Sequence, residues 1–439
     1  MKTNIYFLFF IGLFSATLLM TTSCNRNQPT NKDAFNNGSS ERNMIVIISD
    51  LHLGANLDYA ETNANLKPLE HFLAQIKTSA NVKELVIAGD LIDEWFVPGN
   101  IDTYNGKDQS DFVKRVAATN KEVFDEFNNI IQDGKILVTY VPGNHDLAVT
   151  AKNIDLILPG INQARDNVLG IGTYTPADFP ELAIEHGHRY NFYCAPDPFS
   201  NQDVAPGTIM PPGYFFTRIA TTHVMQQLPA GKGIVTPITP NTSGDQSQDN
   251  LFKYWESWKW AIELFTLNNK FDEKIIVTNV NGFTDTYSVN DLLPYQTTPG
   301  GVIDVNLYKG IQDTWAERQE RNLVNVNIPV GHAIDNAGND AETDNQANIQ
   351  YFLNQNSNKR IVVFGHTHVC RIDSSQNYLG QKSIYANSGT WIDHNPKGPT
   401  TTFLIITPQN KKKSSETYVS LYNFENEIVT QIAVDSLRI

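Results

Sequence analysis

The sequence predicts an α/β fold: a mainly parallel β-sheet flanked by helices, interrupted by a large and partly helical insertion. Short runs of β-branched and aliphatic residues are typical of strands buried on both faces. Segments with apolar residues at helical spacing lie between these runs, and alternating strands and helices favour a parallel sheet. The length of 439 residues exceeds the usual size of one hydrophobic core. A domain that carries an insertion is therefore expected.

Five of the predicted strands end at residues that commonly bind metals. The strands are residues 44–48, 85–88, 136–141, 182–184 and 361–364. The residues that follow them are, in order, Asp50 and His52, then Asp90, then Asn144 and His145, then His186 and His188, then His366 and His368. Ligands of open α/β sheets bind beyond the carboxyl ends of the strands. We therefore expect these side chains to meet at one rim.

Helices are predicted between the strands. One is marked by Leu66, Leu69, Phe72, Leu73 and Ile76. A second extends from Phe112 to Ile131 and is expected to end at Gly134, a residue that commonly terminates helices. After the fifth ligand-bearing strand, residues 384–386 predict a strand that runs into Asn387, and residues 401–406 and 417–422 predict two closing strands.

The types of donor favour two adjacent metal ions. We predict one site at Asp50, His52, Asp90 and His368, and a second at Asn144, His186 and His366. Asp90 suits a bridge, since each carboxylate oxygen can bind one metal. Imidazole and oxygen donors without thiolates suit divalent or trivalent Mn, Fe or Zn better than Ca or Mg. Two metals about 3.5–4 Å apart can generate hydroxide at neutral pH and stabilise displacement at phosphorus.

The ordered motifs Asp-x-His, Gly-Asp, Gly-Asn-His-Asp, His and Gly-His-x-His resemble those of the calcineurin-like metallophosphoesterases, over roughly residues 44–392. The resemblance implies a four-layer α/β/β/α sandwich and dinuclear-metal-dependent hydrolysis of phosphate esters. It also implies that His145 is not a ligand but assists the leaving group, with Asp146 orienting its ring. We expect His188 to be a non-ligand: it lies behind the ligands, contacts substrate or is a surface histidine. Asn387 is placed near the site, behind the ligands or in contact with substrate.

Two alternatives remain open. Residues 50–54 and 89–95 look closest to the branch that contains UDP-2,3-diacylglucosamine pyrophosphohydrolases, which favours a sugar-nucleotide or lipid-precursor pyrophosphohydrolase. A non-catalytic protein that binds phosphate compounds is the other alternative, because a fold alone does not establish chemistry. In each case we expect a phosphorylated small-molecule or lipid ligand. The net charge of −14 argues against a nucleic-acid partner.

The N-terminal residues predict a cell-envelope address. Residues 1–23 resemble a bacterial lipoprotein signal peptide, with Cys24 as the lipidation site. Residues 24–43 are rich in Asn, Ser and Gly and are expected to form a flexible tether. We therefore expect a membrane-anchored lipoprotein that faces the periplasm or lies in the outer membrane; the alternative is a soluble periplasmic or secreted protein. Cys194 and Cys370 can form at most one disulfide between them.

The remaining residues divide into a core of two parts, residues 44–188 and 351–439, and an insertion at residues 189–350. The insertion has helical patterns at 215–228 and 250–267, and the second of these includes Tyr254, Trp255, Trp258 and Trp260. This aromatic group forms either the core of the insertion or the lining of a pocket. Because the insertion begins and ends at ligand-bearing strands, it is positioned to set specificity.

Overall fold

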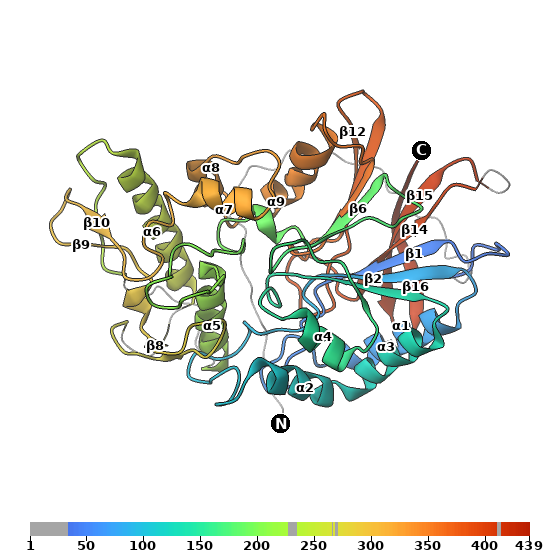
Figure 1. The fold of residues 1–439 in the computed structure, drawn as a ribbon, viewed down its shortest axis with the longest axis horizontal. Helices are drawn as coiled ribbons and strands as arrows, with labels where there is room; N and C mark the ends of the chain where they lie inside the picture. The colour runs from blue at the N-terminus through green and yellow to red at the C-terminus, as the bar shows by residue number, and fades with distance from the viewer. Residues whose placement is uncertain (1–33, 227–234, 266, 268–270, 411–413) are drawn as a thin grey trace.

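The computed structural model describes residues 34–226, 235–265, 267, 271–410 and 414–439, and it confirms the predicted α/β fold (Figure 1). A domain of two sheets and their covering helices forms one side of the molecule. The insertion forms a lobe on the other side, coloured green to orange in Figure 1. The predicted signal peptide and Cys24 lie outside the described residues.

The larger sheet has seven strands in the order β16-β15-β14-β1-β2-β3-β4. Strands β1 to β4 are parallel, while β14 pairs antiparallel with β1 and is followed by β15 and β16. The bounds are β1 Met44–Ile48, β2 Val82–Ala88, β3 Leu137–Val141, β4 Asn162–Gln163, β14 Thr402–Thr407, β15 Thr417–Glu425 and β16 Ile428–Leu437.

The second sheet has five strands in the order β12-β13-β11-β6-β5, of which β6, β11 and β13 are parallel. The bounds are β5 Thr173–Tyr174, β6 Leu182–Glu185, β11 Ile361–Phe364, β12 Arg371–Gln376 and β13 Lys382–Asn387. The sheets pack face to face: Ile45 and Ile47 of β1 share one apolar cluster with Ile361 and Val363 of β11. This alternation follows from the two-residue period of a strand.

Helices cover the outer face of each sheet, which gives the four layers that the resemblance implies. Helices α1 to α4 lie on the larger sheet, while α9 and the π-helical turn η3 lie on the smaller one (Figure 1). Their bounds are α1 Leu66–Thr78, α2 Gln109–Thr119, α3 Lys121–Asp133, α4 Ala151–Ile157, α9 Asp340–Ala347 and η3 Asn348–Phe352.

The single helix predicted from Phe112 to Ile131 is in fact two helices. The chain breaks at Asn120, whose buried side-chain amide donates to the carbonyl oxygens of Gly54 and Val116. This side-chain bond competes with helical hydrogen bonding, as short polar side chains often do. The predicted end at Gly134 is confirmed, since this residue caps α3 with a φ of 66°.

The insertion contains helices and short β-ribbons. The bounds are η1 His188–Tyr190, α5 Pro212–Met225, α6 Gln246–Leu264, β7 Ile276–Val277, β8 Thr286–Tyr287, η2 Val289–Asp291, β9 Tyr295–Gln296, β10 Ile303–Asp304, α7 Trp315–Arg321 and α8 Val330–Asp335. Of the aromatic group on α6, Tyr254, Trp255 and Trp258 are buried in the core of this lobe, whereas Trp260 is half-buried and lines a pocket. The aromatic group therefore forms the core of the insertion through three of its residues and the lining of a pocket through Trp260.

Residues 34–43 pack against the domain, so the C-terminal half of the predicted tether is not free. Phe35 is buried, and its ring lies 5.9 Å from that of Phe72 and 5.8 Å from that of Phe403. Asn81 binds the backbone of the same segment through the carbonyl oxygens of Ser39 and Glu41. Any tether therefore ends before residue 34.

Two further features concern thiols and membranes. Cys194 and Cys370 are free cysteines, so the disulfide left open by the sequence does not form here. Among the described residues, none of the helices has the length and apolar character needed to cross a bilayer.

Candidate metal centre and the pocket over it

The structure brings the seven predicted ligands together where strands of both sheets end. Asp50 and His52 follow β1, Asp90 follows β2, and Asn144 follows β3, all from the larger sheet. The smaller sheet contributes the other three: His186 follows β6, while His366 and His368 follow β11. The aliphatic runs thus form strands by burial, and the polar residues lie just beyond their carboxyl ends.

In the first predicted set of ligands, the Nε2 atoms of two histidines lie close to one carboxylate oxygen. His368 Nε2 lies 3.1 Å from Asp50 Oδ1 and 3.2 Å from His52 Nε2. His52 Nε2 lies 3.9 Å from the same Asp50 oxygen. One oxygen and two nitrogens therefore surround a single small volume.

The second predicted set meets at His186. Its Nε2 lies 3.1 Å from Asn144 Oδ1 and 3.1 Å from Asp90 Oδ2, and its ring centroid is 5.2 Å from that of His366. Asp90 Oδ2 also lies 3.6 Å from His52 Nε2 of the first set. Asp90 therefore stands between the two sets, as a bridging carboxylate must.

Five of these ligand residues have a backbone conformation that L-amino acids rarely adopt. The positive φ values are 54° at Asp50, 44° at His52, 52° at Asp90, 68° at His366 and 60° at His368. Such residues cost free energy and persist where the surrounding structure imposes them, most often at functional sites. Here the strain turns side chains from successive strand ends toward one point.

The glycines of the motifs are required by close packing against the ligands. A Cβ atom at Gly143 would lie 2.1 Å from Asp90 Oδ1, and one at Gly89 would lie 2.3 Å from His186 Nδ1. Gly89 also has a φ of 93°, which favours glycine. The glycines before Asp90 and Asn144 therefore make room for a ligand from a neighbouring loop.

The donor set fits two metal ions. Asp50 and Asp90 are fully buried, and neither forms an ion pair with a lysine or arginine in the part of the chain that the structure describes. Burial alone would raise the pKa of both carboxyls, but neighbouring histidines, His368 for Asp50 and His186 for Asp90, bring it below the ordinary value. Buried anions need compensating positive charge. Divalent cations supply it while leaving the imidazoles neutral, and the mixed nitrogen and oxygen donors suit Mn, Fe or Zn.

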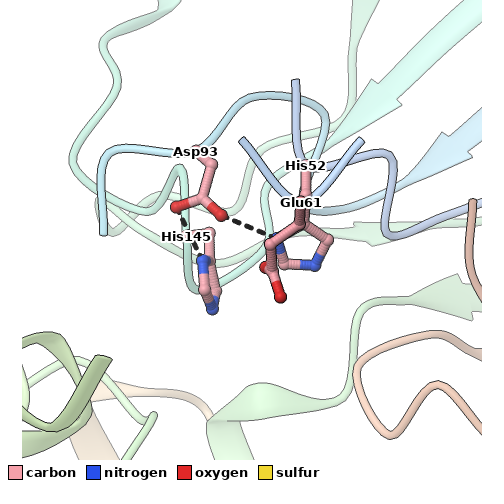
Figure 2. A group of neighbouring side chains, drawn as sticks. All are labelled: His52, Glu61, Asp93 and His145. Atoms are coloured by element: carbon pink, nitrogen blue, oxygen red, sulfur yellow. Dashed lines mark hydrogen bonds and ion pairs between the residues drawn. The ribbon is translucent and has the colours of Figure 1, made fainter. Parts of the chain in front are cut away.

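His145 is held by Asp93 and not by Asp146, so the predicted role of Asp146 is wrong. His145 Nδ1 lies 2.8 Å from Asp93 Oδ1, as Figure 2 shows. The Asp146 carboxylate is instead turned into the loop, where it accepts the backbone amides of Gly143 and Leu91. Those two amides would otherwise be buried without partners, so Asp146 fixes the loop and Asp93 fixes the ring.

Asp93 links a predicted metal ligand, His52, to the non-ligand His145, and the sequence reasoning missed it. Its second oxygen lies 2.8 Å from His52 Nδ1, so one carboxylate lies between two imidazoles (Figure 2). Because a carboxylate only accepts, both Nδ1 atoms carry hydrogen, which leaves His52 Nε2 free for a metal and His145 Nε2 free toward the pocket. The signal was its position three residues after Asp90 in the same loop.

Glu61 is a second missed carboxyl at the same histidine. Its Oε2 lies 3.2 Å from His52 Nδ1, and the residue lines the pocket. Burial raises the pKa of Glu61 to about 7, partly offset by His52 and reinforced by Asp93. Glu61 lies in the loop between β1 and α1, after the Asp-x-His motif but not part of it, so the sequence offered no reason to place it here.

The two auxiliary residues lie behind the ligands. His188 is buried, its Nε2 lies 2.8 Å from the carbonyl oxygen of Gly170, and burial lowers its pKa to about 3. Asn387 is buried at the end of β13, where its amide donates to the carbonyl oxygen of Gly365 at 2.7 Å and to Thr367 Oγ1 at 3.1 Å. Asn387 thus braces the Gly-His-Thr-His loop.

A cavity of about 160 Å³ opens over the ligands. The core domain contributes His52, Asp90, Asn144, His145, His366 and His368 to its floor. The insertion contributes the rings of Tyr193, Phe216 and Trp260 and also Asp340, which pairs with Lys397 of the core domain. Residues far apart in the sequence therefore enclose one pocket.

The fold and these side chains define an α/β domain with a candidate metal centre at the ends of its strands. Residues 44–210 match the family model described as calcineurin-like phosphoesterase. The match covers less than half of the chain and ends before His366 and His368. No curated protein matches the chain.

Two solved structures show a weak likeness. Vacuolar protein sorting 29 from Cryptosporidium parvum is 10% identical, with a TM-score of 0.31, over 90% of this chain and 98% of its own. Nuclease MPE from Pseudomonas putida is 16% identical, with a TM-score of 0.19, over 36% of this chain and 55% of its own. With TM-scores this low, neither likeness bears on the fold or the function.

Proposed function

We propose that the chain hydrolyses phosphate esters with the help of two metal ions. The observation that carries this proposal is the position of Asp90 between two sets of ligands, with His145 held beside them by Asp93. Asp50, His52, Asp90 and His368 would hold one ion, and Asp90, Asn144, His186 and His366 the other. When bound, the metals supply a nucleophile at neutral pH and polarise the phosphoryl oxygens.

The residues of the chain prepare the rest of the reaction. Asp93 keeps hydrogen on Nδ1 of His145, so Nε2 is the atom that hands a proton to the departing oxygen. Burial would lower the pKa of His145, but the carboxylates of Asp93 and Asp90 raise it above the ordinary value, which favours the protonated ring. The side chain is 12% exposed and lines the pocket, so a bound substrate can reach it.

A substrate panel tests this proposal. The purified full-length chain, loaded with Mn, Fe or Zn, is assayed on phosphomonoesters, phosphodiesters and nucleotide pyrophosphates. We expect hydrolysis that chelation abolishes and metal restores, with two ions per active chain by elemental analysis. Absence of hydrolysis with every metal and ester class would contradict the proposal and favour a phosphate-binding protein.

A pyrophosphohydrolase acting on sugar nucleotides or lipid precursors is the second candidate. It is supported by residues 50–54 and 89–95, and by a cation at the pocket rim. The ammonium of Lys397 lies 2.8 Å from Asp340 and 3.2 Å from the carbonyl oxygen of Thr367, the residue between the two His ligands. A second phosphate would need such a cation outside the metal centre. Faster cleavage of pyrophosphates than of simple esters would favour this candidate.

We also propose an envelope location, which rests on residues 1–24 of the sequence. Lipid attached at Cys24 would anchor the domain, since several acyl chains together hold a protein stably at a membrane. The substrate is then a phosphorylated small molecule or lipid, and the acidic net charge disfavours nucleic acid. Cys24→Ser should release active protein from membranes. Equal membrane retention of the variant and the parent would exclude the anchor.

A further inference from the structure

The insertion packs against the ring of Trp95, which in turn stacks on His145, the proposed general acid. The ring of His145 stacks on that of Trp95, with centroids 4.8 Å apart and an angle of 29°. Trp95 in turn packs against the start of α5: its ring is 6.3 Å from that of Tyr214, and a Cβ on Gly213 would lie 3.1 Å from its Cζ3 atom. Figure 1 shows α5 on the side of the lobe next to the domain. A group that leaves past His145 therefore meets the insertion.

The wall that the insertion presents there is aromatic and uncharged. Tyr193, Phe216 and Trp260 line the pocket, and each is only half-buried, unlike Tyr254 and Trp258 in the core of the lobe. Aromatic rings that are left partly open in a pocket commonly serve binding, since they offer large apolar contact area.

Two of these rings are held by the core of the lobe. Tyr193 stacks on Tyr254 at 5.8 Å with an angle of 25°, and Phe216 packs edge-on against Phe265 at 5.4 Å. Their faces are therefore fixed before any ligand binds, which lowers the entropy lost on binding. A rigid set of rings fits a flat ring better than a flexible chain.

Another part of the pocket lining is polar. Lys397 is paired with Asp340, and the side-chain amide of Asn395 donates to the carbonyl oxygen of His368 at 2.8 Å. A cation thus lies beside the loop of His368, while the apolar rings of the insertion pack, by way of Trp95, against His145. This asymmetry gives a bound ester one orientation, with its apolar part on the leaving-group side.

We propose that the substrate's leaving group carries a flat aromatic ring, and that Tyr193, Phe216 and Trp260 form the subsite that binds it. The proposal rests on the proposed function in one respect: the subsite affects the rate of hydrolysis only if the aromatic ring leaves as His145 protonates its oxygen. In hydrolysis the bond from phosphorus to that oxygen breaks, water supplies the new oxygen on phosphorus, and the aromatic alcohol departs with one proton.

Kinetics with matched leaving groups test the subsite. The full-length protein is compared on phenyl, 2-naphthyl and octyl esters of whichever phosphate class it hydrolyses. Phenol and 2-naphthol are similar acids, so their difference reports ring contact rather than leaving-group reactivity. We expect kcat/KM for the naphthyl ester to exceed that for the phenyl ester by roughly 10-fold. Trp260→Ala and Phe216→Ala should bring the ratio toward one, whereas Glu256→Ala, an exposed position on α6, should leave it unchanged.

A binding measurement separates this subsite from the chemistry. 2-Naphthol is titrated into the metal-free full-length protein, and Trp260→Ala should weaken its binding by roughly 10-fold. If 2-naphthol binds in a way that depends on Trp260 but no ester is hydrolysed, the aromatic subsite is supported and the phosphoesterase function is contradicted. Hydrolysis with equal naphthyl and phenyl rates, or with preference for the octyl ester, would overturn the aromatic subsite and leave the phosphoesterase standing.

Discussion

The wall of the pocket that the core domain provides carries buried charge, whereas the wall that the insertion provides beside His145 is aromatic and neutral. On the core side, Asp50 and Asp90 have no lysine or arginine partner among the described residues, and their backbones have positive φ. On the insertion side, Tyr193 and Phe216 pack on other rings with no comparable strain. In the function proposed above, the core side therefore serves the reaction and the insertion side serves recognition.

The insertion also supports the core side from behind. Asp344 of α9 accepts hydrogen bonds from Thr367, between the two His ligands, and from Tyr385 of β13. In addition, Arg218 of α5 is fully buried and donates to carbonyl oxygens in the loop that follows Trp95, including those of Val97 and Pro98. The insertion is thus a structural part of the site and not only a cover.

The largest effect is expected at the bridging ligand. Asp90→Asn removes the charge and one metal-binding oxygen from both sets, so the protein should lose metal and activity together. The loss of kcat/KM should exceed the roughly 10²–10⁴-fold cost of removing a general acid. Kinetic assays of the variant beside the parent measure the loss of kcat/KM, and elemental analysis measures the loss of metal. Two ions retained in Asp90→Asn would show that Asp90 does not bridge.

Removal of His145 should separate binding of metal from protonation. His145→Ala should keep both ions and lower kcat by roughly 10²–10⁴-fold. The loss should be smaller for a nitrophenyl ester, whose leaving group needs little protonation. Loss of metal in this variant would identify His145 as a ligand.

Asp93 should have a smaller effect, through the histidines it holds. Asp93→Asn places an amide N–H beside an imidazole that must keep hydrogen on Nδ1, so kcat should fall by roughly 10–100-fold. The pH profile of kcat should also shift, because the carboxylate that raises the pKa of His145 is gone. Asp146→Asn is the matched control: its carboxylate accepts the backbone amides of Leu91 and Gly143 and does not contact His145 Nδ1, which Asp93 holds, so the variant should change stability and leave that profile in place. Equal pH profiles for Asp93→Asn and the parent would reject the positioning role.

The core wall was predictable because its signals are local. Each aliphatic run forms a strand by burial, and the carboxyl ends of strands meet at a rim, so Asp50, Asp90 and His186 could be placed together without coordinates. The partner of His145 was not predictable in this way. Asp93 and Asp146 are both carboxylates in adjacent loops, and only the direction of each side chain decides which one faces the ring.

The insertion wall depends on packing between segments that no pattern connects. Trp260 and Trp258 lie on the same helix, yet one lines the pocket and the other is buried in the lobe. Tyr193 follows the fourth motif in an irregular segment, where neither helical nor strand periodicity applies. Helical spacing predicted α5 and α6, but the face that each presents to the domain is fixed by tertiary contacts such as those of Arg218.

The smallest expected effect is on the pH dependence of the free energy of unfolding. It arises from a single buried carboxyl on the core side. Glu94 is buried on the core side, where Tyr104 and Gln109 donate to its Oε1, and Oε2 has no hydrogen-bond partner among the described residues. Burial raises the pKa of Glu94 from 4.5 to about 7. Between these two pH values the folded state binds a proton that the unfolded state has released, so the free energy of unfolding falls as pH rises.

Glu94→Gln should remove this part of the pH dependence. Gln keeps the oxygen that accepts both hydrogen bonds and cannot ionise, so the variant should gain stability relative to the parent as pH rises from 5 to 8. The 2.5-unit difference in pKa (7 − 4.5) corresponds to at most about 3 kcal/mol, as an order of magnitude. Urea unfolding at a series of pH values measures the gain. Buried Arg218 gives the comparison: its partners are carbonyl oxygens and the Tyr214 hydroxyl, so Arg218→Met should destabilise the protein by a similar amount at every pH in this range. A difference between Glu94→Gln and the parent that stays constant from pH 5 to 8 would mean that Glu94 is not protonated in the folded protein.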